Sequence, residues 1–312
     1  MKRTQAITRP DLGHQRVWFW RGWRVRYTYL RPHDPVAQQR SPMLLIHGFG
    51  ASLEQWRSNL TVWGQQRPVY ALDLLGFGHS QKPGILLGAN VWQAQVHDFW
   101  QAVIGQPVIL LGHSLGALVA LTATAQHPAM THRLILLTLP LARQELVAGW
   151  LDRLARGVES LVATPLLLRP LFLVVRRPGF IHKALTSIYQ TPEWVDDQLV
   201  YLLTRPTLER GAARTLCYLV KSRTQAEFSD STANLLQRVS VPILLLWGTQ
   251  DRVLPTAWAD QILSSNSAIT YRAIEGAGHC LYDEVPRVID REIQRWLSSL
   301  DQISSQTPKT PL

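Results

Sequence analysis

The pentapeptide Gly112-His113-Ser114-Leu115-Gly116 combines a potential nucleophile with two flanking glycines. It follows the apolar run Val108–Leu111 and opens a stretch in which apolar residues recur with helical spacing. A serine on so sharp a turn between a strand and a helix carries its hydroxyl above the sheet, where it can attack a carbonyl carbon. The backbone N–H of Leu115, at the helix N-terminus, would stabilise the negative charge that develops on oxygen. The motif therefore predicts a nucleophilic serine.

A nucleophilic serine needs a general base, and the base needs a carboxylate that orients it. His279 ends the motif Gly-Ala-Gly-His, directly after the strand-like run Ile269–Ile274. Asp251 follows another such run, Ile243–Gly248, in the loop where the chain order serine, acid, histidine places the acid. Ser114, Asp251 and His279 are therefore predicted to form a catalytic triad. Asp230 and Asp260 remain alternatives for the acid, and the other histidines after the serine, in less suitable places, are His127, His132 and His182.

A second N–H donor for the developing oxyanion is expected from the loop after the first buried run, which begins at His47 and continues Gly-Phe-Gly. The sequence predicts an oxyanion hole made by the backbone amides of Phe49 and Leu115. His47 itself stands at the end of a strand. It is expected to hold this loop by a side-chain hydrogen bond rather than to act as a base.

Two further residues look reactive but are expected to be structural. Asp73 ends a strand before a glycine-rich turn, where a carboxylate typically caps backbone amides. Cys280, beside His279, is expected to pack as a small apolar side chain. Nothing in the sequence indicates a metal site or an organic cofactor.

Short apolar runs that alternate with helical stretches show the elements that must position these residues. Each run reads as a strand covered on both faces, which is typical of a parallel sheet, and strand followed by helix, repeated, predicts a doubly wound α/β domain. Before them, Val17–Trp20 and Trp23–Tyr29 alternate apolar and polar residues around Arg21-Gly22, as in a β-hairpin at a sheet edge. The predicted strands are Met43–His47, Val69–Asp73, Val108–Gly112, Leu134–Leu139, Ile243–Gly248 and Ile269–Ile274, and the predicted helices are Leu53–Gln65, Val91–Ile104, Leu115–Gln126, Ala257–Leu263 and Val285–Leu300.

The alternation of strands and helices fails once. From about Leu141 to Asn234 the pattern is helical, with prolines and arginines but no convincing strand. We therefore expect residues 1–140 and 235–300 to form one core, residues 141–234 to form an inserted helical cap, and residues 301–312 to form a flexible tail.

Three longer motifs sharpen this interpretation: Val69–Ser80, Trp92–Phe99 and Gly276–Pro286. Together with the serine motif they resemble the α/β-hydrolase superfamily over Trp18–Leu300, and within it the pheophytinase and chlorophyll dephytylase group of photosynthetic organisms. The sequence departs from that group at His113, where asparagine is frequent, and at Ala117, where a second glycine is frequent.

This resemblance implies a serine carboxylic ester hydrolase that removes phytol from chlorophyll or a related pigment. Relatives that open epoxides or displace halide carry aspartate at the position of Ser114. The serine therefore argues against epoxide hydrolysis and against dehalogenation. Hydrolysis of other lipid esters, carbon–carbon bond hydrolysis and perhydrolysis remain alternatives with the same triad. A protein that only binds a pigment or lipid under its cap is a more remote alternative.

The distribution of charge along the chain indicates which kind of partner the protein binds. The chain has 312 residues and a formal charge of +10, and its first 31 residues hold eight basic side chains against the single Asp11. No nucleic-acid-binding signature accompanies this charge, so an anionic membrane surface is the expected partner and nucleic acid is not. Leu161–Val175 contains eleven apolar residues in fifteen but is too short to cross a bilayer. Arg176-Arg177 follows it, which suits shallow insertion at anionic headgroups.

Within that apolar segment, Leu171 and Phe172 are candidates both for membrane contact and for binding an apolar substrate. The two cysteines form no Cys-x-x-Cys pair, and the N-terminal residues lack the apolar region of a secretory signal. The expected location is the cytoplasm, with peripheral attachment to the thylakoid membrane implied by the resemblance.

Overall fold

The computed structural model describes residues 12–146, 165–223, 225 and 228–306. One eight-stranded sheet organises them, in the order β1-β2-β4-β3-β5-β6-β7-β8. β2 runs antiparallel to both β1 and β4, and every other pair of neighbours is parallel. The strands are β1 (His14–Trp20), β2 (Trp23–Leu30), β3 (Met43–Ile46), β4 (Val69–Leu72), β5 (Val108–His113), β6 (Thr131–Leu137), β7 (Ile243–Gly248) and β8 (Ile269–Ile274). The predicted mostly parallel, doubly wound sheet is confirmed.

The N-terminal hairpin has the turn that its sequence predicts. Trp20 pairs with Trp23, and the two residues between them, Arg21 and Gly22, have φ angles of 49° and 83°. Positive φ at both central residues is the mark of a type I′ turn, whose twist matches that of two antiparallel strands.

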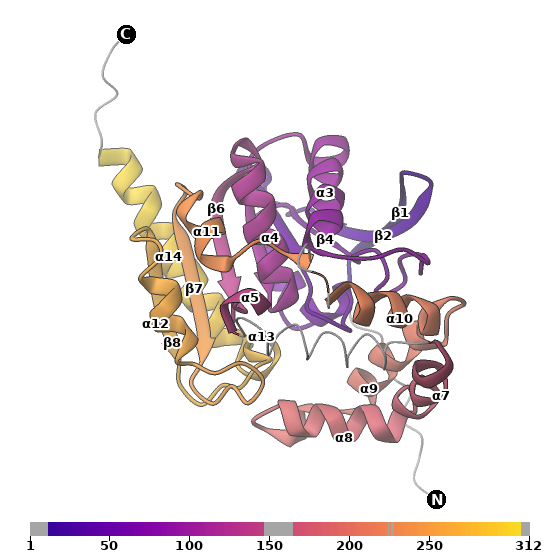
Figure 1. The fold of residues 1–312 in the computed structure, drawn as a ribbon. Coiled ribbons are helices and arrows are strands. Elements are labelled where there is room, and N and C mark those ends of the chain that lie inside the picture. Colours follow the sequence, from indigo (N-terminus) through magenta and orange to yellow (C-terminus); the bar gives the residue numbers. More distant parts are fainter. Residues whose placement is uncertain (1–11, 147–164, 224, 226–227, 307–312) are drawn as a thin grey trace, which may run out of the picture.

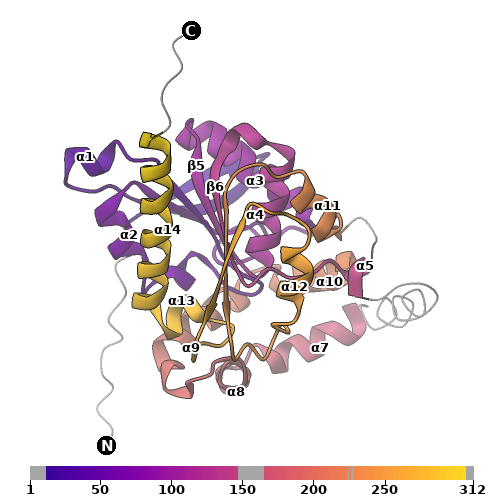
Figure 2. The same ribbon diagram turned by 90° about the vertical axis from the view of Figure 1, so that its left-hand side faces the viewer.

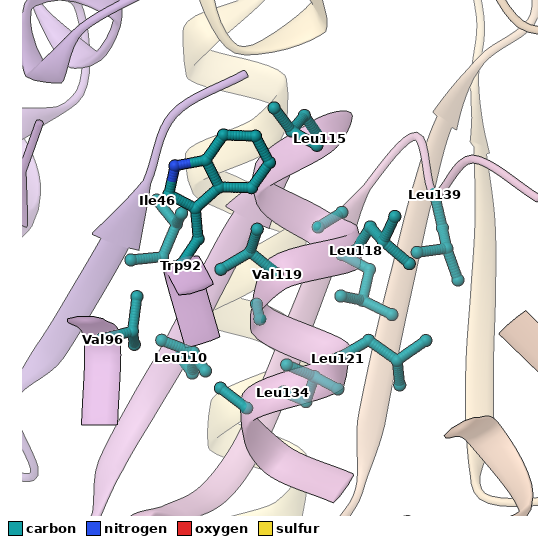
Figure 3. Packing of buried hydrophobic residues seen from close by; sticks show 14 of the residues in the cluster. Ile46, Trp92, Val96, Leu110, Leu115, Leu118, Val119, Leu121, Leu134 and Leu139 are labelled. Atoms are coloured by element: carbon teal, nitrogen blue, oxygen red, sulfur yellow. The ribbon is translucent and has the colours of Figure 1, made fainter. Parts of the chain in front are cut away.

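Side-chain alternation along the strands divides the core into two layers. In β3, Leu44 and Ile46 belong to one apolar cluster, while Met43 and Leu45 belong to the other. The first cluster is completed by α3 (Ala89–Phe99) and α4 (Leu115–Gln126), as Figure 3 shows for Trp92 and Val96 of α3 and Leu118 and Val119 of α4 against the strands. The second is completed by α2 (Leu60–Gln66) and α14 (Pro286–Gln306). Helices therefore cover both faces of the sheet (Figure 2).

Two predicted helices differ from the structure. The stretch predicted as one helix from Leu53 is divided into a 3₁₀ turn, η1 (Leu53–Trp56), and α2, because Arg57 and Ser58 between them turn toward Asp283 and donate hydrogen bonds to it. At the other end of the chain, α14 continues to Gln306, where the sequence predicts a tail from residue 301. An ion pair between Asp301 and Arg133 of β6 attaches this additional turn to the sheet, so the predicted tail is too long.

The segment between β6 and β7 contains helices in its described part. They are α5 (Arg143–Leu146), α7 (Pro165–Val175), α8 (Pro178–Ile188), α9 (Asp197–Thr204), α10 (Ala212–Arg223) and α11 (Thr232–Gln237). We refer to residues 165–223, which contain α7 to α10, as the helical insertion; in Figure 1 these four helices lie together below the sheet. Residues 161–164, the start of the predicted apolar segment, lie outside the described residues. None of the helices within the described ranges is both long and apolar enough to cross a bilayer.

Candidate active site

The sheet topology brings the predicted site residues to one edge. β3, β5, β7 and β8 are parallel, so the loops that follow them leave the sheet on the same side. The connection after β3 runs through α2 on one face, and the connection after β5 runs through α4 on the other. Adjacent strands with such diverging connections leave a crevice at their carboxyl ends, where α/β proteins bind ligands. Phe49 follows β3 and Ser114 follows β5, so both lie at this crevice.

Ser114 occupies the strained turn that the pentapeptide predicts. Its φ and ψ angles are 53° and −118°, a backbone conformation that is costly for a residue with a side chain. Its N–H donates to the Leu137 carbonyl of β6 at 2.9 Å, and its own carbonyl accepts the N–H of Ala117 at 2.9 Å, which starts α4. Its side chain does not cap the helix. The backbone is thus fixed on both sides while the hydroxyl is left to face the pocket.

The two glycines of the pentapeptide are required by close approach rather than by their φ angles. A Cβ atom on Gly112 would lie 2.2 Å from the Gly116 carbonyl oxygen, and a Cβ atom on Gly116 would lie 2.3 Å from the Ile46 carbonyl oxygen. Both separations are far shorter than van der Waals contact. Only glycine therefore allows α4 to start directly against β3 and β5.

His279 and Asp251 meet as the sequence predicts. The Nδ1 atom of His279 lies 2.9 Å from Oδ2 of Asp251, whose side chain is completely buried. The other carboxylate oxygen, Oδ1, accepts the backbone N–H groups of Val253 and Leu254 at 2.8 and 3.0 Å. Asp251 is therefore held by its own loop and in turn fixes the imidazole, with Nδ1 as the donor and Nε2 facing away from the acid.

The loop that carries His279 is attached to the serine motif by His113. Nε2–H of His113 donates to the backbone carbonyl of His279 at 3.0 Å, and the two imidazole rings lie 4.8 Å apart. Burial, and after it the neighbouring His279, lowers the pKa of His113 well below its usual value, so His113 is neutral. Sequence reasoning missed this role. The residue was visible only as a departure from asparagine beside the serine.

Glu284, in α13 (Leu281–Glu284), is a second residue that sequence reasoning missed. Its buried carboxylate accepts the backbone N–H of Gly278 and of Cys280 at 3.2 Å each, the two residues on either side of His279. It also accepts the N–H of Gln190 from the helical insertion at 3.0 Å. Burial raises the pKa of Glu284. This one side chain connects the histidine loop to the insertion, and its only sequence signal was its place in the motif after His279.

The loop after β3 is held by His47, as predicted. Its Nε2 accepts the N–H of Leu74 at 3.0 Å, and its Nδ1–H donates to the Gly48 carbonyl at 2.8 Å. Burial lowers the pKa of His47, which keeps the ring neutral in this arrangement. The loop so fixed carries Phe49, whose ring is half exposed and packs edge-on against Phe77. Leu115, the other predicted oxyanion donor, is the first residue of α4, where backbone N–H groups have no partner within the helix.

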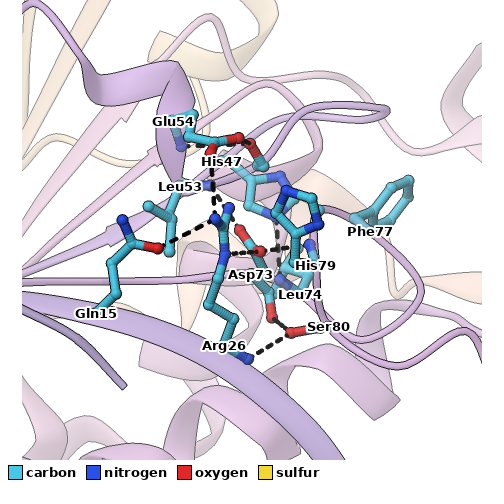
Figure 4. A network of polar contacts seen from close by, with 12 residues as sticks. Gln15, Arg26, His47, Leu53, Glu54, Asp73, Leu74, Phe77, His79 and Ser80 are labelled. Atoms are coloured by element: carbon cyan, nitrogen blue, oxygen red, sulfur yellow. Dashed lines mark hydrogen bonds and ion pairs between the residues drawn. The ribbon is translucent and has the colours of Figure 1, made fainter. Parts of the chain in front are cut away.

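Asp73 caps backbone amides, as predicted, and also forms a buried ion pair (Figure 4). Its two oxygens accept the N–H groups of Leu53 and His79 at 2.7 Å each. In addition, Nε of Arg26 lies 2.7 Å from Oδ2, and Nη1 of Arg26 lies 3.1 Å from Glu54. This network joins β2, the end of β4 and η1 beneath the loop that carries Phe49. The partner arginine, on the N-terminal hairpin, was not predicted.

Cys280 is buried, and burial raises its pKa to about 12. A thiol with such a pKa is protonated near neutral pH and is a poor nucleophile. The structure therefore agrees with the interpretation of Cys280 as a packed side chain.

A pocket of about 520 Å³ opens above these residues. Phe49, Ser114 and His279 line it from the core, and the helical insertion lines it mainly with apolar side chains, among them Phe172, Val175, Ile181, Leu185, Leu199 and Leu203. Of the two candidate residues in α7, Phe172 is buried and lines the pocket, whereas Leu171 is 52% exposed and faces away from it. Among the described residues the Ser114 hydroxyl makes no hydrogen bond, and Ser114 and His279 line the same pocket.

The fold, the strained serine and the histidine–aspartate pair define a known class. The chain belongs to the Alpha/beta hydrolase family, which matches residues 43–292. It is 28% identical over 259 residues to an uncharacterized protein of Mycobacterium tuberculosis, covering 82% of this chain and 75% of that protein. It is 27% identical over 288 residues to the human 1-acylglycerol-3-phosphate O-acyltransferase ABHD5, covering 84% and 79% of the two chains.

A solved membrane phospholipase A, described as a bacterial virulence factor, has a similar fold. Its TM-score is 0.71 at 23% sequence identity, and the match covers 92% of this chain and 86% of the phospholipase. At this level of identity the similarity concerns the fold.

Proposed function

We propose that this protein is a serine carboxylic ester hydrolase with Ser114 as nucleophile, His279 as general base and Asp251 as the acid that orients the base. The hydrogen bond between His279 and Asp251, at a pocket that Ser114 also lines, is the observation that carries the proposal. The strained backbone of Ser114 adds weight, because strain persists where the surrounding structure holds a residue for function.

The reaction follows from this arrangement. Nε2 of His279 takes the proton of Ser114 as Oγ attacks the ester carbonyl carbon, and the N–H groups of Phe49 and Leu115 stabilise the resulting oxyanion. His279 then gives the proton to the leaving alcohol, which leaves an acyl group on Ser114. Water, deprotonated by His279, attacks that acyl group, and His279 returns the proton to Oγ of Ser114 as the acid is released. Asp251 holds the imidazole throughout and stabilises its positive charge.

The pocket favours an ester with a long apolar chain, because its walls in the helical insertion are mostly aliphatic and aromatic. Two substrate groups fit this description. Phytyl esters of chlorophyll-type pigments are suggested by the motifs shared with the dephytylase group. Glycerolipid esters are suggested by the relative named as an acyltransferase for 1-acylglycerol-3-phosphate and by the phospholipase with a similar fold.

A direct comparison of substrates tests this function. The purified protein is incubated with chlorophyll a, pheophytin a, a phospholipid and nitrophenyl esters of two and twelve carbons. Because the long chain can bury its surface in the pocket, the twelve-carbon ester is expected to have a kcat/KM at least about tenfold above that of the two-carbon ester. Equal rates for the two nitrophenyl esters, or no hydrolysis of any ester, would contradict the proposal.

We also propose that the outer face of α7 attaches the protein peripherally to an anionic membrane, with the thylakoid as the membrane that the dephytylase resemblance suggests. Leu166 is 83% and Leu171 52% exposed, and Leu173 and Val174 beside them are exposed as well. Arg169 and Arg177, also exposed, lie on the same stretch of chain. Exposed apolar side chains flanked by cations suit shallow insertion among anionic headgroups.

Co-sedimentation with liposomes that contain anionic lipid tests this attachment. Wild-type protein is expected to sediment at low salt and less at high salt, because salt screens the cationic part of the contact. Changing Leu166→Ser and Leu171→Ser together should remove most of the binding. Val36→Ser, at another exposed apolar position on α1 (Pro35–Gln38), should leave it intact. Phe172 lines the pocket, so Phe172→Ser is expected to change hydrolysis instead. Absence of wild-type sedimentation at low salt would contradict the attachment.

A further inference from the structure

The charged side chains that line the pocket are not equivalent. Besides its histidines, the pocket is lined by Glu54, Lys82, Arg176 and Asp283. Three of these are already neutralised by ion pairs: Glu54 with Arg26 at 3.1 Å, Lys82 with Glu209 at 3.0 Å, and Asp283 with Arg57 at 3.1 Å.

Arg176 is the exception. Within the part of the chain that the structure describes, its guanidinium has neither an ion pair nor a hydrogen bond, although the side chain is half-buried. Its backbone N–H continues α7 by donating to the Phe172 carbonyl at 3.0 Å. Phe172, Val175 and Arg176 therefore share one face of the helix, and all three line the pocket. The next residue, Arg177, is exposed and does not line it.

We infer that Arg176 binds an anionic group of the substrate, so that the pocket takes an amphiphilic ester that carries a phosphate or a carboxylate. A half-buried guanidinium among apolar side chains has lost part of its hydration, and an oxyanion that accepts two parallel N–H bonds restores that stabilisation. The apolar walls accommodate the chain, and Arg176 fixes the charged end. This inference rests on the proposed function and selects within it, because chlorophyll carries no anionic group while many glycerolipids do.

Binding measured without turnover tests the inference. Octyl phosphate, octanoate and octanol share one chain and differ in charge, and their affinities for the Ser114→Ala protein can be compared by calorimetry. At least one of the two anions is expected to bind about tenfold more tightly than octanol, and to weaken as salt rises. Preference for octyl phosphate indicates that the anionic group of the ester substrate is a phosphate, and preference for octanoate indicates that it is a carboxylate.

Variants of two adjacent arginines assign the effect. Arg176→Gln should reduce the affinity for the anion to that for octanol, and its retained affinity for octanol shows that the pocket is still formed. Arg177→Gln removes the same charge from the neighbouring position and should keep the preference. Equal affinities for all three ligands, or an equal loss in both variants, would overturn the inference. These binding measurements need no hydrolysis. If the protein hydrolysed no ester, the proposed function would be refuted, and the affinities would still show whether Arg176 binds an anion.

Discussion

Replacing Ser114 with alanine is expected to lower kcat for ester hydrolysis by roughly 10⁶-fold while the protein stays folded. The hydroxyl is the proposed nucleophile, and its side chain does not cap α4, so its removal costs no structural hydrogen bond there. His279→Ala should lose a similar amount, because without the base the hydroxyl keeps its proton. Asp251→Asn should lose less, roughly 10⁴-fold, since the base is then misoriented but still present.

Three measurements check this result. Steady-state kinetics give the losses, circular dichroism gives the fold, and a fluorophosphonate probe should label the wild-type protein at Ser114 and leave Ser114→Ala unlabelled. The double variant Ser114→Ala, His279→Ala should be no worse than either single variant, because members of a triad act as a unit. Ser264→Ala, at an exposed serine after α12 (Trp258–Leu263), is the matched control and should keep full activity. More than a few per cent of activity in Ser114→Ala would show that another residue is the nucleophile.

The positions of the three proposed triad residues could be predicted because each residue stands in a local pattern. Ser114 follows a buried apolar run and opens a helix, and Asp251 and His279 come directly after two further runs. Parallel strands place such ends at one edge of a sheet, so no knowledge of distant contacts was needed. Strand bounds were missed where polarity hid them: β6 begins at Thr131, three residues before the predicted start, because His132 and Arg133 break the apolar pattern.

The residues that hold the His279 loop in place could not be predicted in the same way. His113 donates to the His279 carbonyl, and Glu284 accepts the N–H groups of Gly278, Cys280 and Gln190. In each case the partner is a backbone N–H or carbonyl group. Because nearly every residue has these groups, the sequence does not show which of them will be the partner. Such pairings become visible only when the chain is folded.

The helical insertion shows another limit of sequence reasoning. Its apolar composition and the short length of Leu161–Val175 indicate a helix at an interface, but apolar residues occur on both sides of α7. A two-sided pattern does not tell which face is inside. The structure makes the distinction, because Phe172 lines the pocket whereas Leu171 is exposed to solvent. The two roles predicted for both residues are therefore proposed for one residue each.

Asp73→Asn is expected to lower the free energy of unfolding by about 3–5 kcal/mol, the usual cost of removing one partner from a buried ion pair. The substitution keeps the size of the side chain but removes its charge. Arg26, which is nearly buried, would keep only Glu54 as a partner. The NH₂ group of the new asparagine would also face the backbone N–H of Leu53 or of His79, which now donates to a carboxylate oxygen of Asp73. Urea unfolding measures the loss. Asp34→Ala, which removes an exposed cap of α1, should cost only about 1 kcal/mol.

A double-mutant cycle and the pH dependence identify the source of this stability. Once Asp73 is asparagine, adding Arg26→Met should cost much less than it does in the wild type, because the unpaired charge is removed with it. Burial by itself would raise the pKa of Asp73, but Arg26 and the backbone N–H groups outweigh burial and hold the pKa below its usual value. An aspartate whose pKa is lower in the folded than in the unfolded protein stabilises the fold at pH values above its unfolded-state pKa, about 3.9. This stabilisation is lost as the pH falls through the pKa of the folded state. The difference in the free energy of unfolding between wild type and Asp73→Asn should therefore be largest at neutral pH and should decrease below about pH 4. A difference of less than about 1 kcal/mol at neutral pH would show that the network does not stabilise the fold.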